Sequence, residues 1–309
     1  MTRLLRPAFS ALVLVVGLFA VAWHLWPQRV VESLVSFNRR LSGLSPRSVQ
    51  VGTHTLHYLE GGKGETVLLL HGLFADKDHW TEFSRRLTPR FRVLALDLPG
   101  FGDSTRLADE SYAYDAQVER LHAFTLALGL TRFHIAGNSM GGALAALYAA
   151  RYPERVLSLG FIGAPHGLRA LVPSPVEEEI ARGLMPLVVT SRDEFERLVD
   201  RMFVQRPFLP GPLLDVLARR ALKDVPGSVR MWHAHRVQGN VLESLLPRLT
   251  VRSFSLWGEG DQVFHISGAA RLWALPGHEG HVLVGVGHLP MMERPAETGA
   301  LYRDFLLGD

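Results

Sequence analysis

A glycine-rich turn constrains this chain more than any other stretch of its sequence. The turn reads Gly137-Asn138-Ser139-Met140-Gly141-Gly142, and it separates the apolar run 133–136 from the small-residue run 143–150. This order predicts a strand, a very tight turn and a helix, because residues without side chains let the strand and helix approach closely. A serine at the apex lies beside a helix N-terminus, whose free N–H groups can stabilise an oxyanion. The pattern favours a nucleophile at Ser139, with Gly137, Asn138 and Gly141 forming its elbow, over a glycine-rich turn that holds a serine by chance.

Two later strand ends carry a carboxylate and an imidazole. The apolar segment 251–257 leads into Gly258-Glu259-Gly260-Asp261, and the predicted strand 282–286 leads into Gly287-His288-Leu289-Pro290. Carboxyl ends of parallel strands meet at one edge of a sheet, so both groups can reach Ser139. The order Ser, Asp, His is the one that follows a nucleophile elbow. We therefore predict a triad of Ser139, Asp261 and His288. No carboxylate follows the strand 156–162, the usual alternative position of the acid.

An acyl-transfer site also needs donors for the developing oxyanion. The backbone N–H of Met140, the residue after the nucleophile, is the first predicted donor. The second is expected in the loop 71–80, where Gly72 lets the chain turn back over the site. We assign the second donor to the Leu73 N–H, with Phe74 as the alternative.

The rest of the chain alternates short strands and helices, which predicts an α/β fold with a mostly parallel sheet and helices on both faces. An opening hairpin is expected at 49–51 and 56–59. The remaining elements before the interruption are strands at 67–70, 92–96, 133–139 and 156–162, and helices at 80–87, 115–128 and 140–150. The alternation stops between 165 and 249, where only helices are expected, at 176–182, 193–203, 213–223 and 229–238. It resumes with the strand 251–257, a helix at 266–274, the strand 282–286 and a helix at 295–307. We assign 47–164 and 250–309 to the catalytic core and 165–249 to a helical cap, or lid.

The N-terminal segment has the composition of a membrane anchor. Arg3 and Arg6 precede the uncharged run 8–26, about 19 residues that would extend about 28 Å as a helix. We interpret residues 1–28 as a transmembrane anchor. A cleaved signal peptide with the site Ala20-Val21-Ala22 is the alternative, and it would leave a secreted esterase.

The next segment, 29–46, is predicted to be an amphipathic juxtamembrane helix. Its apolar residues recur at helical spacing, at Val30, Leu34, Phe37, Leu41 and Leu44. Such a stripe can lie on membrane lipids, pair with a second copy in a homodimer, or pack on the catalytic domain, and the sequence leaves these three open. Membrane lipids are expected to contact residues 8–44.

Composition excludes several other chemistries. The chain has no cysteine, so disulfides and thiol catalysis are absent, and its net charge of +3 comes from scattered arginines rather than a basic patch. We therefore expect no nucleic-acid partner. The histidines of 233–235 and 278–281 lack the spacing of helical zinc sites, and 62–66 lacks the spacing of a phosphate-binding loop. No metal, nucleotide or other cofactor is expected.

Several motifs together resemble the α/β-hydrolase superfamily over roughly residues 50–305. They are the loop 71–80, Asp97-Leu98-Pro99-Gly100-Phe101-Gly102-Asp103-Ser104, the elbow 137–142, the Trp257–Asp261 segment and Gly287–Pro290. The loop and elbow are similar to those of family V bacterial lipases and of the membrane-anchored monoacylglycerol-lipase branch of the ABHD proteins. With the anchor included, the chain resembles bacterial inner-membrane phospholipases A.

This resemblance implies a membrane-tethered serine hydrolase that cleaves lipid acyl esters and releases a fatty acid. It implies an inner-membrane location. An uncleaved N-terminal anchor usually has its catalytic domain exported, so we expect this domain in the periplasm. It also implies that Asp97 and Asp103 hold a loop and that His71 is a scaffold residue. The alternatives are a carbon–carbon bond hydrolase of aromatic degradation, which shares the elbow, and a non-catalytic protein with a hydrolase fold.

Overall fold

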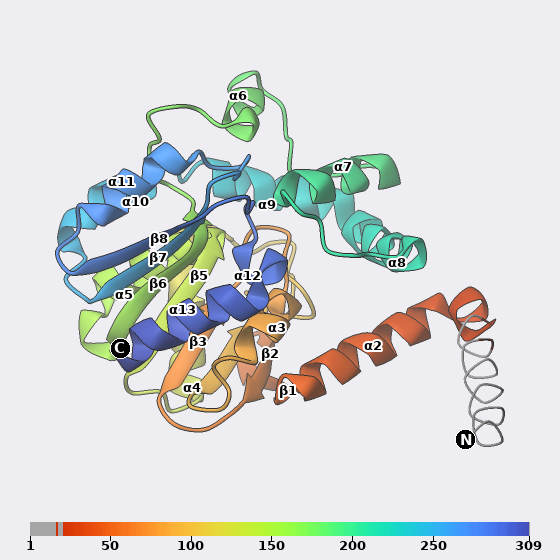
Figure 1. Ribbon diagram of the computed structural model, residues 1–309, viewed down its shortest axis with the longest axis horizontal. Coiled ribbons are helices and arrows are strands. Elements are labelled where there is room, and N and C mark those ends of the chain that lie inside the picture. The colour runs from red at the N-terminus through yellow and green to blue at the C-terminus, as the bar shows by residue number, and fades with distance from the viewer. Residues whose placement is uncertain (1–16, 18–20, 309) are drawn as a thin grey trace, which may run out of the picture.

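The computed structural model describes residue 17 and residues 21–308. Its centre is one eight-stranded sheet with the spatial order β1-β2-β4-β3-β5-β6-β7-β8 (Figure 1). The first two strands are antiparallel to their neighbours, and β4, β3, β5, β6, β7 and β8 run parallel. This arrangement confirms the predicted α/β fold with a mostly parallel sheet. The strands are β1 (Leu44–Val51), β2 (His54–Gly61), β3 (Thr66–Leu70), β4 (Arg92–Leu96), β5 (Phe133–Ser139), β6 (Val156–Pro165), β7 (Ser253–Gly258) and β8 (His278–Leu283).

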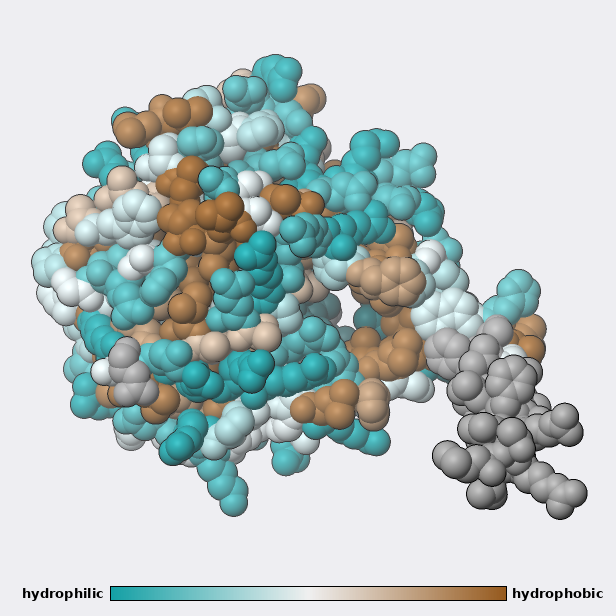
Figure 2. Space-filling model, in the orientation of Figure 1, coloured by the Kyte–Doolittle hydropathy of each residue, from teal (hydrophilic) through white to brown (hydrophobic). Residues whose placement is uncertain are grey.

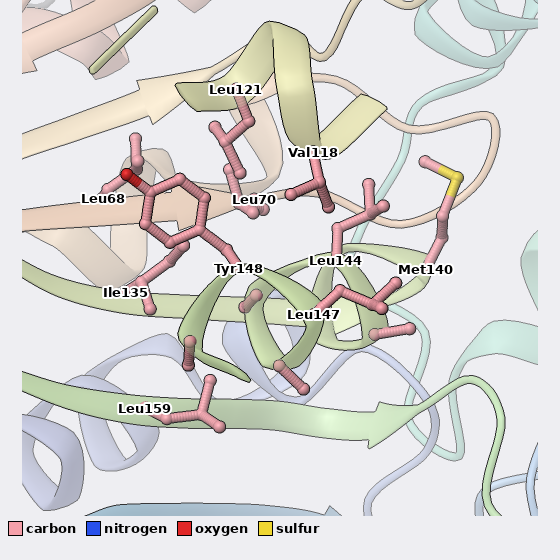
Figure 3. Close-up of a cluster of buried hydrophobic side chains, with 14 of the residues drawn as sticks. Leu68, Leu70, Val118, Leu121, Ile135, Met140, Leu144, Leu147, Tyr148 and Leu159 are labelled. Carbon is pink, nitrogen blue, oxygen red and sulfur yellow. The ribbon is translucent and has the colours of Figure 1, made fainter. Parts of the chain in front are cut away.

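Helices cover both faces of this sheet because its central strands are apolar on both sides. In β3, Leu68 and Leu70 pack into one buried cluster with the helices α4 and α5, whereas Val67 and Leu69 pack into another with α3 and α13. This division follows from the two-residue period of a strand. Figure 3 shows the first cluster, in which side chains of α4 and α5 meet those of the strands. The helices of the core are α3 (Thr81–Ser84), α4 (Tyr114–Ala127), α5 (Met140–Arg151), α11 (Ala269–Trp273), α12 (Pro290–Glu293) and α13 (Pro295–Leu307).

Residues 166–252, all of which are described, contain helices and no strand. The helices are α6 (Pro175–Ala181), α7 (Arg192–Met202), α8 (Gly211–Ala221), α9 (Val225–Arg236) and α10 (Val241–Leu245), and Figure 1 shows them in green to cyan. Two of them begin at serine N-caps: Ser174 accepts from the Glu177 N–H, and Ser191 accepts from the Glu194 N–H. The four helices expected here are present, and the short α10 was not expected.

Several predicted boundaries were wrong, and three of them have a clear physical reason. Strand β8 spans 278–283 rather than 282–286. It is a half-exposed edge strand with polar residues, so a prediction based on apolar runs did not identify its first residues. The helix expected at 80–87 is a 3₁₀ turn (Lys77–Trp80) followed by the single turn α3. The amphipathic helix α2 spans Pro27–Leu41 and ends before Leu44, because Gly43 adopts φ +68° and Leu44 begins β1, where it is buried.

The predicted anchor at residues 1–28 lies mostly outside the described residues. Within the described part, no helix combines the length and apolar character that crossing a membrane requires. Helix α2 extends away from the core in Figure 1. Its C-terminal end is nevertheless attached, because the Arg39 guanidinium donates to both carboxylate oxygens of Asp78, at 2.6 and 2.5 Å.

Candidate active site

Ser139 lies at the junction of β5 and α5 in strained backbone. Its φ is +52° and ψ is −118°, and it shares a positive φ with only one other non-glycine residue in the described part of the chain, Phe74. The neighbouring glycines are required by contact: a Cβ on Gly137 would lie 2.2 Å from the carbonyl carbon of Gly141, and one on Gly141 would lie 2.3 Å from the Leu70 oxygen. The structure therefore has the local geometry predicted for a nucleophile elbow.

Asp261 and His288 are hydrogen-bonded to each other. His288 Nδ1 lies 2.8 Å from Asp261 Oδ2, and both side chains are buried. The other carboxylate oxygen of Asp261 accepts from the N–H groups of Val263 and Phe264, at 2.7 and 3.0 Å. A carboxylate only accepts, so the His288 proton lies on Nδ1 and Nε2 keeps a free lone pair. That tautomer is the one a general base needs.

The loops that carry these groups are joined to the elbow. Asn138 Nδ2 donates to the backbone carbonyls of Ile162 and His288, at 3.0 and 3.1 Å. A Cβ on Gly72 would lie 3.2 Å from Ser139 Cβ, so the loop after β3 passes directly over the nucleophile. The elbow is thus joined both to the loop that carries His288 and to the loop 71–74.

The loop that carries Leu73, one of the two expected oxyanion donors, is held by a neutral histidine. His71 Nε2 accepts from the Leu98 N–H at 3.0 Å, so Nδ1 carries the proton and donates to the Gly72 carbonyl at 2.7 Å. Burial lowers the pKa of His71 to about 4, so the ring stays uncharged at neutral pH. This arrangement agrees with the scaffold role expected for His71. Met140 supplies the first N–H of α5, a position without an intrahelical acceptor.

A buried ion pair secures the next part of the same loop. Lys77 Nζ lies 2.6 Å from carboxylate oxygens of both Asp97 and Asp103, and Asp97 is fully buried. Asp97 also accepts from the backbone N–H groups of Lys77 and Asp103, at 2.7 and 2.9 Å. The two aspartates therefore hold loops, as expected, and Lys77 is the partner that the sequence did not reveal.

Glu293 is a positioning residue that sequence reasoning missed. Its carboxylate accepts from the Gly287 N–H at 2.8 Å and from the Gln205 N–H at 2.6 Å. The His288 N–H also donates to the Met202 carbonyl at 2.9 Å. The histidine loop is thereby fastened to the end of α7. The only sequence signal was the position of Glu293, five residues after His288 in the short helix α12.

A cavity of about 220 Å³ lies between the end of β6 and the helices α6 and α9. Three of its lining residues contact the proposed triad directly, and one of them is Val263, whose N–H donates to Asp261. The His166 N–H donates to the Ser139 carbonyl at 3.0 Å, and the Phe264 ring lies 5.6 Å from the His288 ring. The remaining walls combine apolar side chains with polar ones, among them His235, Arg236 and Asn240. Among residue 17 and residues 21–308, no group of three His, Asp or Glu side chains is arranged to hold a metal ion.

Comparison with known proteins agrees with this fold. The family model for the alpha/beta hydrolase fold matches residues 65–295. Lipase 1 of Psychrobacter immobilis is 29% identical, with 89% of this chain and 88% of the lipase covered. Monoacylglycerol lipase ABHD6 of Bos taurus is 29% identical, with 97% of this chain and 93% of the lipase covered.

A solved structure is similar over the whole chain. The crystal structure of a membrane phospholipase A, described as a bacterial virulence factor, is 41% identical with a TM-score of 0.89. The match covers 100% of this chain and 99% of that one. The chain belongs to the alpha/beta hydrolase fold family and is a serine hydrolase of the esterase and lipase type.

Proposed function

We propose that Ser139, His288 and Asp261 form a catalytic triad that hydrolyses lipid acyl esters. His288 Nε2 takes the Ser139 proton as Oγ attacks the ester carbonyl carbon, and it returns that proton to the departing alcohol. The acyl-enzyme is then hydrolysed by a water molecule that His288 deprotonates, which releases the fatty acid. Asp261 holds the imidazole in the required tautomer and stabilises the imidazolium.

The observation that carries this proposal is the Asp261–His288 hydrogen bond beside a strained Ser139. A positive φ at a serine costs on the order of 1–3 kcal/mol, which folded proteins tolerate mainly at functional sites. The backbone N–H groups of Leu73 and Met140 are our oxyanion donors. The contact between Gly72 and Ser139 supports the assignment of Leu73, and the N-terminal position of Met140 in α5 supports the other.

We assign residues 165–249 to a cap over this site and residues 1–28 to a single membrane anchor. The cap is supported by the bond from His288 to Met202 of α7 and by the cavity between α6, α9 and β6. We infer a bacterial inner-membrane enzyme with its catalytic domain, 47–164 and 250–309, on the periplasmic side. The likeness to a membrane phospholipase A supports this location.

The exposed stripe of α2 supports contact with lipid or with a second copy of the chain. Leu34, Phe37 and Leu41 are 43%, 59% and 58% exposed, whereas Val31 on another face is buried. Figure 2 shows apolar side chains along this helix in brown. Helix α2 contacts α8, α3 and β1 on its covered side, which leaves the stripe of Leu34, Phe37 and Leu41 available to lipid or to a second copy.

Active-site labelling tests the nucleophile. A fluorophosphonate probe should modify the purified full-length protein on the peptide that contains Ser139, and Ser139→Ala should lose both labelling and about 10⁴–10⁶-fold in kcat on a short p-nitrophenyl ester. Ser255→Ala, which removes another buried hydroxyl, is the control and should keep its labelling. Wild-type activity in Ser139→Ala would disprove the assignment.

Membrane attachment requires a truncation that leaves the core intact. A variant beginning at Pro27 keeps α2 and its Arg39–Asp78 contact, whereas one beginning at Arg47 removes both. We expect the full chain to stay with membranes after a carbonate wash and the Pro27 variant to be released. Retention of the Pro27 variant would show that α2 or the cap, rather than the anchor, holds the protein at the membrane.

A further inference from the structure

Three buried polar side chains meet at the cavity beside the proposed triad. The Tyr114 hydroxyl lies 3.0 Å from His166 Nδ1 and 2.8 Å from His235 Nδ1. Tyr114 comes from α4 in the core, His166 follows β6, and His235 belongs to α9. All three side chains are more than nine-tenths buried. A cluster assembled from three separate segments links the helices of the insertion to the strand end next to Ser139.

The hydrogen bonds fix opposite tautomers for the two histidines. A tyrosine hydroxyl has one proton, so it donates to one Nδ1 and must accept from the other. One imidazole therefore carries its proton on Nδ1 and the other on Nε2. Burial lowers the pKa of His166 to about 3 and the pKa of His235 well below its ordinary value, and it raises the pKa of Tyr114. All three groups are neutral near pH 7.

The remaining ring nitrogens, the Nε2 atoms of His166 and His235, have no partner in the described part of the chain. Neither of these two nitrogens is fully buried, so both remain accessible. Both residues line the 220 Å³ cavity. One Nε2 is a donor and the other is an acceptor. The ring centres are 4.0 Å apart, so a single oxygen atom can contact both.

We propose that the Nε2 atoms of His166 and His235 bind a free hydroxyl group on the alcohol portion of the ester. A hydroxyl can accept one hydrogen bond and donate another at a single atom, as the water molecule that it would displace does. Two of the cavity's lining residues, His166 and Phe264, contact Ser139 and His288, so the cavity lies beside the proposed triad and is where we place the alcohol portion of the ester. Its volume of about 220 Å³ is enough for a small polyol.

Charged groups fit this pair of nitrogens less well. A phosphate or carboxylate oxygen only accepts hydrogen bonds, so one Nε2 lone pair would face it without a proton. Protonating a second nitrogen would require charging a buried imidazole against its lowered pKa. The cluster therefore selects a neutral hydroxyl at this position.

The inference rests on the proposed ester hydrolysis, so its test compares two esters with the same acyl group. Glyceryl monobutanoate carries free hydroxyls on its alcohol, and propyl butanoate lacks them. In His235→Asn the amide can replace Nδ1 at Tyr114 but leaves nothing at the Nε2 position. We expect this variant to lower the ratio of kcat/KM for glyceryl over propyl ester about tenfold.

Two further variants separate recognition from structure. His235→Gln places an amide near the Nε2 position and should recover part of the ratio. His233→Asn changes an exposed histidine two residues away on α9 and should leave the ratio at the wild-type value. Equal losses on both esters, or an unchanged ratio in His235→Asn, would overturn the proposal.

The wild-type protein provides a measurement that does not depend on folding of a variant. Glycerol should inhibit hydrolysis of propyl butanoate more strongly than 1-propanol does at the same concentration, and equal inhibition would contradict the inference. Failure of the proposed function has a different result. Then the wild-type protein would cleave neither ester and would not react with a fluorophosphonate.

Discussion

The buried pair Lys77–Asp97 gives a prediction whose magnitude can be worked out from the structure. The two side chains are 4% and 0% exposed and lie 2.6 Å apart. Lys77→Met keeps the apolar length of the side chain but leaves the Asp97 carboxylate without its cation. Breaking a buried pair by removing one partner typically costs about 3–5 kcal/mol in the free energy of unfolding. At about 2–4 °C per kcal/mol for a domain of this size, Tm should fall by roughly 6–20 °C.

The pH dependence of that loss provides a second, independent measure. Burial raises the pKa of the Asp97 carboxyl to about 6 even beside Lys77, and removal of the cation should raise it further. A carboxyl with a pKa above its unfolded value of about 3.9 binds its proton more tightly in the folded state. Stability therefore falls as pH rises through the folded pKa. The loss in Lys77→Met should be largest at pH 8 and smaller at pH 5.5, where Asp97 takes up a proton.

The same lysine provides the control. Asp103 forms the second ion pair of Lys77, but its side chain is 68% exposed. An exposed pair contributes about 0–1 kcal/mol, so Asp103→Asn should lower Tm by no more than about 4 °C. The measurement is the Tm of the wild type and of both variants at pH 5.5 and at pH 8. A loss in Lys77→Met no greater than that in Asp103→Asn, or a loss equal at both pH values, would refute the reasoning.

Two other substitutions test how the site is held. Glu293→Gln removes the charge that binds the N–H groups of Gly287 and Gln205, so kcat on a p-nitrophenyl ester should fall roughly tenfold. The control is Glu297→Gln, which changes an exposed carboxylate of α13 and should have the wild-type kcat. Gly141→Ala would place a Cβ 2.3 Å from the Leu70 oxygen, so the free energy of unfolding, measured in urea, should fall by about 1–3 kcal/mol. In the control Gly211→Ala the new Cβ meets no atom within 4 Å, so the free energy of unfolding should stay the same or rise.

The elements that carry the proposed triad could be predicted because each is a local pattern at a strand end. Strands β5 and β7 are buried throughout, so they read as continuous apolar or small-residue runs, and the polar residues directly after each strand are easy to identify. Strand β8 was misplaced because its outer residues face solvent. The Gly-His-x-Pro segment nevertheless marks the loop of His288 independently of the strand, and the structure places that residue beside Asp261.

The contacts that hold the site could not be predicted in the same way. Lys77 is 20 residues from Asp97 and 26 from Asp103, and a lone lysine in a polar loop has the same local sequence whether it is buried or exposed. Lys77 is buried because the loop that follows β4 brings Asp97 and Asp103 against it. The sequence therefore predicts which loops meet but does not predict which charges they enclose.

The contacts of Tyr114 with His166 and His235 could not be predicted from the sequence either. Tyr114 is 52 residues from His166 and 121 from His235, and these pairs form only when α9 packs against the strand end that precedes His166. In the sequence, His233-Ala234-His235 was informative only as a pattern without metal-ligand spacing. Ser139 is recognisable because strained backbone requires glycines beside it, whereas His166 and His235 sit in ordinary backbone and leave no such trace. The proposed nucleophile can thus be identified from its neighbours in the sequence. The residues proposed to bind the alcohol portion of the substrate are brought together only when the inserted helices pack against the core.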